Sequence, residues 1–137
     1  ELFSAQKAAG AFVNDEPLVQ NNIYSHLSYF SCCSRTHQQF KVSVPYKTRI
    51  LGSTCYTLCS VAKGTSILGF EATPKIWDIA AGWIIVEEAG GSINTWGDTK
   101  PFPLIQGINY SQINFTTIAG LSQNIITKAR QQIIPLQ

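Results

Sequence analysis

Methionine is absent from this sequence of 137 residues, and charged residues make up only 13% of it. The missing methionine and the first residue, Glu1, predict that the amino terminus is a cut or a processed end. The 10 lysines and arginines are scattered, without the clustered basic stripe typical of nucleic-acid binding. No apolar run reaches the roughly 20 residues of a membrane span, and no signal peptide opens the chain. We therefore expect neither a nucleic-acid partner nor a membrane partner.

The low charge also bears on the surface of the folded chain. The charged fraction is about half of the usual share in globular domains, whereas 45% hydrophobic residues is an ordinary value. A chain of this length forms one domain that buries roughly two thirds of its unfolded surface. We predict that part of the remaining surface faces other protein, either a missing half or a partner subunit.

The chain contains four cysteines, at positions 32, 33, 55 and 59. These residues could pair in a secreted protein. Cys55 and Cys59, however, lie four residues apart on a predicted helix and are better interpreted as small buried apolar residues. This interpretation favours a reduced, cytoplasmic setting.

Strand and helix patterns alternate along the chain. Residues 2–20 predict two strands joined by a turn, and residues 24–34 predict a strand covered on both faces. Residues 35–41 are interpreted as a polar connector. Further on, the pattern predicts in order a helix over 55–62, a strand over 66–70, a helix over 78–89, strands over 92–95 and 116–119, and a helix over 123–133 that Ser122 caps. This alternation indicates an α/β layer.

The predicted helix over 78–89 begins with an acidic residue and is otherwise mostly apolar. Asp78 stands where an N-cap is preferred, and the Gly90-Gly91 pair can end the helix. The residues between leave almost no polar stripe, so we expect the helix to be buried on most sides. By pattern alone, Asp78 is either an N-cap or a rigidly placed metal ligand.

Three polar groups stand at the ends of predicted elements. Gly52, Ser53 and Thr54 precede one helix, Glu71 follows a strand, and Asp78 opens the next helix. Ligands collect at such ends in an open α/β sheet. Glu71 suits the hydroxyl groups of a sugar or polyol, although an isolated glutamate is usually a solvated carboxylate. Ser53 and Thr54 fit a helix start as well as they fit substrate contact.

The segment WDIAAGWIIVEEAGG at 77–91 resembles the second signature of the inositol monophosphatase family, which has the form WDxAAGxxIVxEAGG. RILGSTCYTLCSVAKG at 49–64 is similar to another segment of that family, and the similarity spans nearly the whole chain. The resemblance implies the carboxy-terminal part of a layered α/β/α/β/α sugar-phosphatase fold. Residues 1–25 would be strands of the amino-terminal α+β domain, and 26–137 the carboxy-terminal α/β domain.

The resemblance also implies magnesium-assisted hydrolysis of a small phosphate monoester, such as inositol monophosphate or a related sugar or polyol phosphate. Asp78 would be the catalytic residue and a Mg²⁺ ligand. Glu71 would accept a hydrogen bond from a substrate hydroxyl, and Gly52, Ser53 and Thr54 would line the substrate pocket. Family members are commonly dimers, so a homodimer is expected.

The family's first signature, DPxDGT, does not occur in this sequence. The chain therefore resembles the second half only, and one carboxylate is a weak anchor for magnesium. Three alternatives stay open. The chain could be a noncatalytic half that needs a complementary fragment or subunit. It could belong to a nucleotide or bisphosphate phosphatase of the same superfamily. It could also be a sugar-binding module without hydrolytic activity.

Overall fold

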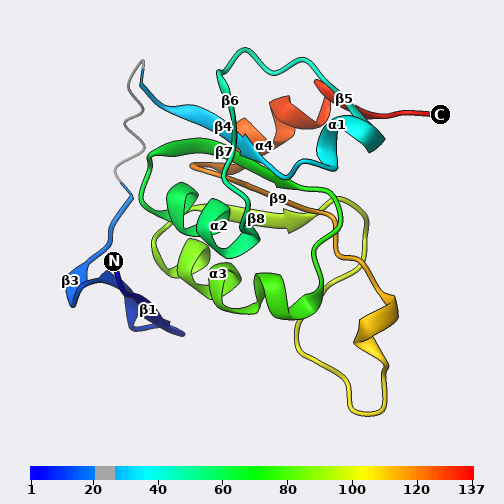
Figure 1. Ribbon diagram of the computed structural model, residues 1–137. Coiled ribbons are helices and arrows are strands. Elements are labelled where there is room, and N and C mark those ends of the chain that lie inside the picture. The colour runs from blue at the N-terminus through cyan, green and yellow to red at the C-terminus, as the bar shows by residue number, and fades with distance from the viewer. Residues whose placement is uncertain (21–26) are drawn as a thin grey trace.

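The computed structural model describes residues 1–20 and 27–137, and a five-stranded sheet lies at its centre (Figure 1). The strands follow the order β6-β4-β7-β9-β8, in which β4 pairs in parallel with β6 and β7, whereas β9 is antiparallel to β7 and β8. Their bounds are β4 Tyr29–Cys32, β6 Thr48–Ile50, β7 Ser66–Glu71, β8 Ser92–Thr95 and β9 Thr117–Gly120. All six residues of β7 are buried, which fits a central strand covered on both faces.

Helices cover both faces of this sheet. Helices α2 (Thr54–Ala62) and α3 (Ile76–Glu88) pack together on one face, and α4 (Gln123–Arg130) lies on the other (Figure 1). Near α4, strand β5 (Phe40–Val42) follows the short helix α1 (Thr36–Gln39) and pairs with β10 (Ile133–Pro135). The 3₁₀-helix η1 (Tyr110–Gln112) belongs to the long connection before β9.

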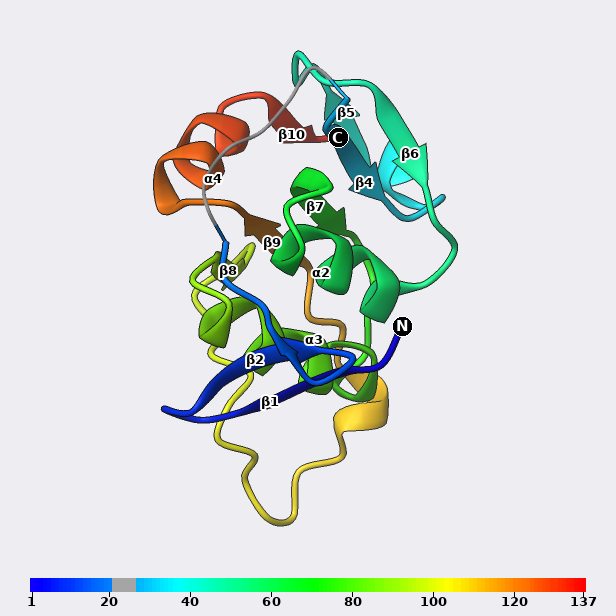
Figure 2. The same ribbon diagram turned by 90° about the vertical axis from the view of Figure 1, so that its left-hand side faces the viewer.

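A second, three-stranded antiparallel sheet lies on the outer side of α3 (Figure 2). It contains β1 (Phe3–Gln6), β2 (Gly10–Val13) and β3 (Glu16–Pro17). The order of layers is thus sheet, helix pair, sheet and helix, which confirms the predicted layered α/β class. The predicted boundary between residues 25 and 26 lies outside the described residues, so the division into two domains remains a prediction.

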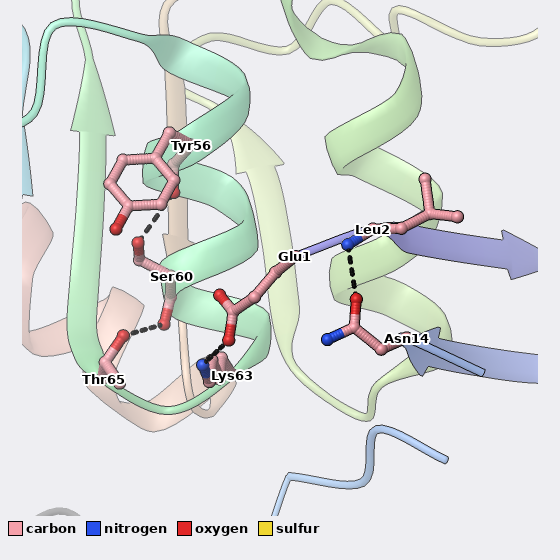
Figure 3. Close-up of polar contacts among 7 residues, drawn as sticks. All are labelled: Glu1, Leu2, Asn14, Tyr56, Ser60, Lys63 and Thr65. Atoms are coloured by element: carbon pink, nitrogen blue, oxygen red, sulfur yellow. Dashed lines mark hydrogen bonds and ion pairs between the residues drawn. The ribbon is translucent and has the colours of Figure 1, made fainter. Parts of the chain in front are cut away.

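Polar contacts connect the first residues to the end of α2 and to the turn after β2 (Figure 3). The carboxylate of Glu1 forms an ion pair with Lys63 at the end of α2. The backbone N–H of Leu2 donates a 2.8 Å hydrogen bond to Oδ1 of Asn14. Glu88 of α3 accepts hydrogen bonds from the amides of Ala8 and Gly10. These bonds hold the small sheet against both helices.

Two glycines allow the layers to approach closely. A Cβ atom at Gly82 of α3 would lie 2.6 Å from Cδ1 of Leu58, and one at Gly69 of β7 would lie 2.9 Å from Cγ2 of Thr57. Both Leu58 and Thr57 belong to α2. Because real Cβ atoms do not approach so closely, only glycine fits at these two points. Helix α2 is therefore packed tightly between α3 and the sheet.

Several predictions about single elements were wrong. Strand β6 occupies residues where only a basic lead-in to a helix is expected, and residues 35–41 contain α1 and the start of β5. The last helix ends at Arg130, and Ile133 is in β10. These short strands have weak sequence patterns, because cross-strand pairing rather than local propensity stabilises them. Of the strand expected over 24–34, the structure has Tyr29–Cys32, and residues 24–26 lie outside the described residues.

Helix α3 is also less covered than its apolar composition predicts. Trp77 is 62% exposed, and Ala80 and Ala81 are exposed as well. On α2, Cys59 is buried as expected but Cys55 is exposed. None of the helices in the described part of the chain has the length and apolar character needed to cross a bilayer.

Candidate functional site

The site is centred on Glu71, the last residue of β7, whose side chain is only 3% exposed. Thr54, the first residue of α2, donates a 3.1 Å hydrogen bond from Oγ1 to Oε2 of Glu71. The parallel strands β6, β4 and β7 all end at this edge of the sheet. The structure therefore brings together Thr54 and Glu71, which the sequence places 17 residues apart.

Burial controls the ionisation of Glu71. Desolvation raises the pKa of this carboxyl group above its ordinary value of 4.5, because the charged form loses its hydration. The side chains of Thr57, Thr54 and Cys33 act in the opposite direction and lower the pKa, and the charge of Asp78 raises it. Glu71 is thus a buried hydrogen-bond acceptor whose charge these three neighbours help to stabilise.

Two of those neighbours, Thr57 and Cys33, were missed by sequence reasoning. Thr57 is fully buried next to Glu71, and within residues 1–20 and 27–137 its hydroxyl has no hydrogen bond of good geometry. The spacing of three residues between Thr54 and Thr57 on a predicted helix is a signal that both lie on one face. Cys33 follows β4 and accepts a 3.4 Å hydrogen bond from the amide of Ala72. Only the parallel pairing of β4 with β7 places it there.

Asp78 lies in the first turn of α3 but is not its N-cap, so that prediction was wrong. The helix begins one turn earlier than expected, with Lys75 as N-cap. Oδ2 of Asp78 accepts a 2.8 Å hydrogen bond from the backbone N–H of Lys75. In the described part of the chain, the other carboxylate oxygen, Oδ1, accepts no hydrogen bond. One oxygen therefore stabilises the helix start, and the other remains available for a ligand.

Gly52 and Ser53 shape the loop that leads into α2. Gly52 has a φ of 76°, a left-handed conformation that favours glycine. Ser53 is the N-cap of α2, and its Oγ accepts a 3.3 Å hydrogen bond from the amide of Tyr56. The helix-start interpretation of Ser53 is therefore confirmed. Both residues are exposed at the same edge of the sheet as Glu71.

The donor atoms at this edge suit a hard cation only in part. Carboxylate oxygens are the ligands that Mg²⁺ prefers, in octahedral geometry and usually with several waters retained. The free oxygen of Asp78 fits such a role, and the charge of Asp78 acts on Glu71, raising its pKa. The residues described here contain no group of three or more histidine, cysteine, aspartate or glutamate side chains that could hold a metal ion. Asp78 can therefore contribute one ligand to a site that needs others.

A mixed five-stranded sheet between helix layers, with Glu71 at the end of one of its parallel strands, places the chain in the α/β class, in which ligands commonly bind at the carboxyl ends of parallel strands. The sequence model of the Inositol monophosphatase family matches residues 1–133. The chain belongs to this family.

Individual relatives agree with this assignment. The chain is 34% identical over 105 residues to a "Nus factor SuhB" of Xylella fastidiosa, covering 68% of this chain and 38% of that protein. It is 28% identical over 152 aligned positions to inositol monophosphatase 1 of Bos taurus, covering 100% of this chain and 52% of the bovine protein. The crystal structure of extragenic suppressor protein suhB from Bartonella henselae superposes with a TM-score of 0.69 at 25% identity, covering 96% of this chain and 51% of that one. The chain thus spans about half or less of the length of these relatives.

Proposed function

We propose that this chain is the carboxy-terminal part of a magnesium-dependent phosphatase that hydrolyses inositol monophosphate or a related small sugar or polyol phosphate. Membership of the Inositol monophosphatase family supports a phosphatase. The observation that carries the proposal is the buried carboxylate of Glu71, which Thr54 holds by a hydrogen bond beside Asp78.

In this proposal Glu71 binds the substrate. Its carboxylate is fixed by Thr54 and accepts a hydrogen bond from a ring hydroxyl group of the polyol. A buried acceptor discriminates strongly against an analogue that lacks the hydroxyl, because the carboxylate would then remain unpaired. Gly52 and Ser53 form the neighbouring wall, where the absence of a side chain at Gly52 leaves space for the substrate.

Asp78 acts on the phosphate side. Its free oxygen contributes one ligand to Mg²⁺, and the hydrogen bond from Lys75 fixes the carboxylate orientation. When bound, the divalent cation stabilises negative charge on the transferring phosphoryl group. The remaining ligands, and the groups that orient the attacking water, would come from an amino-terminal half with the DPxDGT signature.

The decisive experiment uses the chain joined to such an amino-terminal half. Asp78→Asn preserves the size of the side chain and removes its charge, so we expect phosphate release from inositol monophosphate to fall roughly 100-fold or more. The matched control is Asp98→Asn, because Asp98 is an exposed aspartate outside the site. Nearly full activity in Asp78→Asn, or an equal loss in the control, would defeat the proposal.

A second candidate function is a noncatalytic half that works only with a complementary fragment or subunit. The absence of DPxDGT from this sequence favours it. Assaying the 137-residue chain alone with Mg²⁺ and a panel of phosphate esters tests this second candidate. Robust turnover by the isolated chain would exclude the noncatalytic reading. Polyol binding that does not depend on Mg²⁺ would instead point to a sugar-binding module.

The substrate class is tested by the same panel of phosphate esters with the chain joined to its amino-terminal half. We propose a monophosphate as the preferred substrate, with a nucleotide or bisphosphate phosphatase of the same superfamily as the alternative. Preference for a bisphosphate or a dinucleotide phosphate would favour that alternative. We also propose a cytoplasmic homodimer. The reducing environment of the cytoplasm fits the four free cysteines of the described residues. Analytical ultracentrifugation would test whether the protein is a dimer.

A further inference from the structure

Helix α2 carries a second threonine one turn after Thr54. Thr57 is fully buried, and within residues 1–20 and 27–137 its hydroxyl makes no hydrogen bond of good geometry. An unpaired hydroxyl in the interior destabilises a protein. Valine has nearly the same shape and carries no polar atom, so packing alone would favour valine here. The hydroxyl of Thr57 therefore calls for a role other than packing.

The backbone places Thr57 against the strand that carries Glu71. Side chains alternate along a strand, so positions 69 and 71 of β7 face the same side of the sheet. A Cβ atom at Gly69 would lie 2.9 Å from Cγ2 of Thr57, which shows that α2 covers this side. The side chain of Glu71 therefore points toward α2, two residues beyond the place where Thr57 meets the strand.

Thr54 and Thr57 approach Glu71 from the same face of α2. Residues three positions apart on a helix are neighbours, and Thr54 donates its 3.1 Å hydrogen bond to Oε2 of Glu71. Burial raises the pKa of the Glu71 carboxyl group, and the side chains of Thr57 and Thr54 both lower it. The two threonines thus act on one carboxylate in the same sense.

A third hydroxyl group of α2 provides a contrast. Ser60 is only 4% exposed, and its Oγ donates a 2.8 Å hydrogen bond to the backbone carbonyl of Tyr56 (Figure 3). Serine and threonine inside helices commonly bond in this way to the carbonyl four residues earlier. Among the described residues, Thr57 makes no such bond. Its hydroxyl is not held by its own helix and can turn to Glu71.

We propose that Thr57 is a positioning residue for substrate binding, because its buried hydroxyl is a second donor that holds the Glu71 carboxylate for a ring hydroxyl of the polyol. This inference rests on the proposed function. Hydrogen bonds in a site are often poorly aligned without substrate and tighten when substrate binds. Thr54 and Thr57 together keep Glu71 charged and oriented, so that it acts only as an acceptor.

The first test measures the contact in the 137-residue chain itself. A double-mutant cycle of Thr57→Val and Glu71→Gln, with urea unfolding in mildly alkaline buffer, isolates the interaction between the two side chains. We expect a coupling of about tenfold in the unfolding equilibrium constant, as for other residues that share a hydrogen bond. Ser60→Ala in place of Thr57→Val should show no coupling with Glu71→Gln. Additive effects of Thr57→Val and Glu71→Gln would overturn the proposal.

The second test measures substrate binding by the chain joined to an amino-terminal half with the DPxDGT signature. Thr57→Val should raise KM for inositol monophosphate about tenfold with little change in kcat, because a binding interaction is lost. KM for phenyl phosphate, which has no ring hydroxyl, should not change. Thr57→Ser keeps the hydroxyl and should retain the wild-type KM, although it lacks the methyl group that lies over Gly69.

Three results would overturn the substrate role of Thr57. They are an unchanged KM for inositol monophosphate in Thr57→Val, an equal rise for both esters, and the same rise in Thr57→Ser, which would assign the effect to the methyl group. If the joined wild-type protein hydrolyses neither ester, the proposed function fails, and the double-mutant cycle still decides whether Thr57 holds Glu71. Circular dichroism verifies the fold of each variant.

Discussion

Thr54 and Glu71 connect the start of a helix to the end of a strand. Oγ1 of Thr54, the first residue of α2, donates a 3.1 Å hydrogen bond to Oε2 of Glu71, the last residue of β7. Hydrogen bonds to a charged acceptor are stronger than those between neutral groups. This contact fixes the position of the one buried carboxylate in the candidate site, and its removal should affect both stability and ionisation.

Replacing Thr54 with valine tests this contact directly. Thr54→Val keeps the shape of the side chain but removes the donor, so the free energy of unfolding should fall by about 1.5–3 kcal/mol. The pKa of Glu71 should rise further, because one of the groups that lower it is lost. Chemical denaturation and NMR titration of the Glu71 carboxyl group measure the two effects. Thr54→Ser restores the hydroxyl and should behave like the wild type, whereas an unchanged Glu71 pKa in Thr54→Val would contradict the structure.

The raised pKa of Glu71 predicts a dependence of stability on pH. Burial raises this pKa above 4.5 in the folded chain, so between 4.5 and the raised value the folded state binds more protons than the unfolded state. Stability contributed by Glu71 is therefore present at low pH and is lost as the pH rises through this interval. Urea unfolding across this interval should show the wild type losing stability relative to Glu71→Gln. If the wild type instead gained stability relative to Glu71→Gln as the pH rises, the folded structure would stabilise the charged form of the carboxyl group.

Gly82 tests the close approach of α3 to α2. Alanine is favoured over glycine in a helix by about 1 kcal/mol, but its Cβ would lie 2.6 Å from Cδ1 of Leu58. Overpacking of this kind costs about 1–3 kcal/mol. We therefore expect Gly82→Ala to destabilise the chain in thermal or denaturant unfolding. Gly97→Ala is the control, because no atom lies within 4 Å of a Cβ built there. A more stable Gly82→Ala variant would mean that the helices lie further apart.

Ser53 tests the start of α2. Its Oγ accepts a hydrogen bond from the amide of Tyr56, so Ser53→Ala should lower the free energy of unfolding by about 1 kcal/mol. Ser53→Asp retains a capping acceptor and should preserve stability. Denaturant unfolding of both variants at one pH provides the comparison. Equal stability of Ser53→Ala and the wild type would exclude the cap.

Much of the candidate site could be predicted from its local pattern. The alternation of apolar segments with glycine and serine predicted α2, β7 and the strands after it, because these elements carry a clear period and defined caps. The positions of Thr54 and Glu71 at element ends followed from the same pattern. The N-cap of α3 could not be predicted in this way, because both Lys75 and Asp78 precede the apolar run. Only the backbone geometry shows that Lys75 is the N-cap and that Asp78 is the third residue of the helix.

The sequence by itself determined the family, the α/β class and the principal helices and strands, since these depend on local periodicity and on motifs of contiguous residues. Only the tertiary structure decided that Thr57 and Cys33 surround Glu71, that β5 pairs with β10, and that one side of α3 is exposed. Contacts between segments far apart in the chain depend on strand order and helix packing, which no local pattern encodes. The ionisation of Glu71 belongs to this second group, because burial by distant segments sets its pKa.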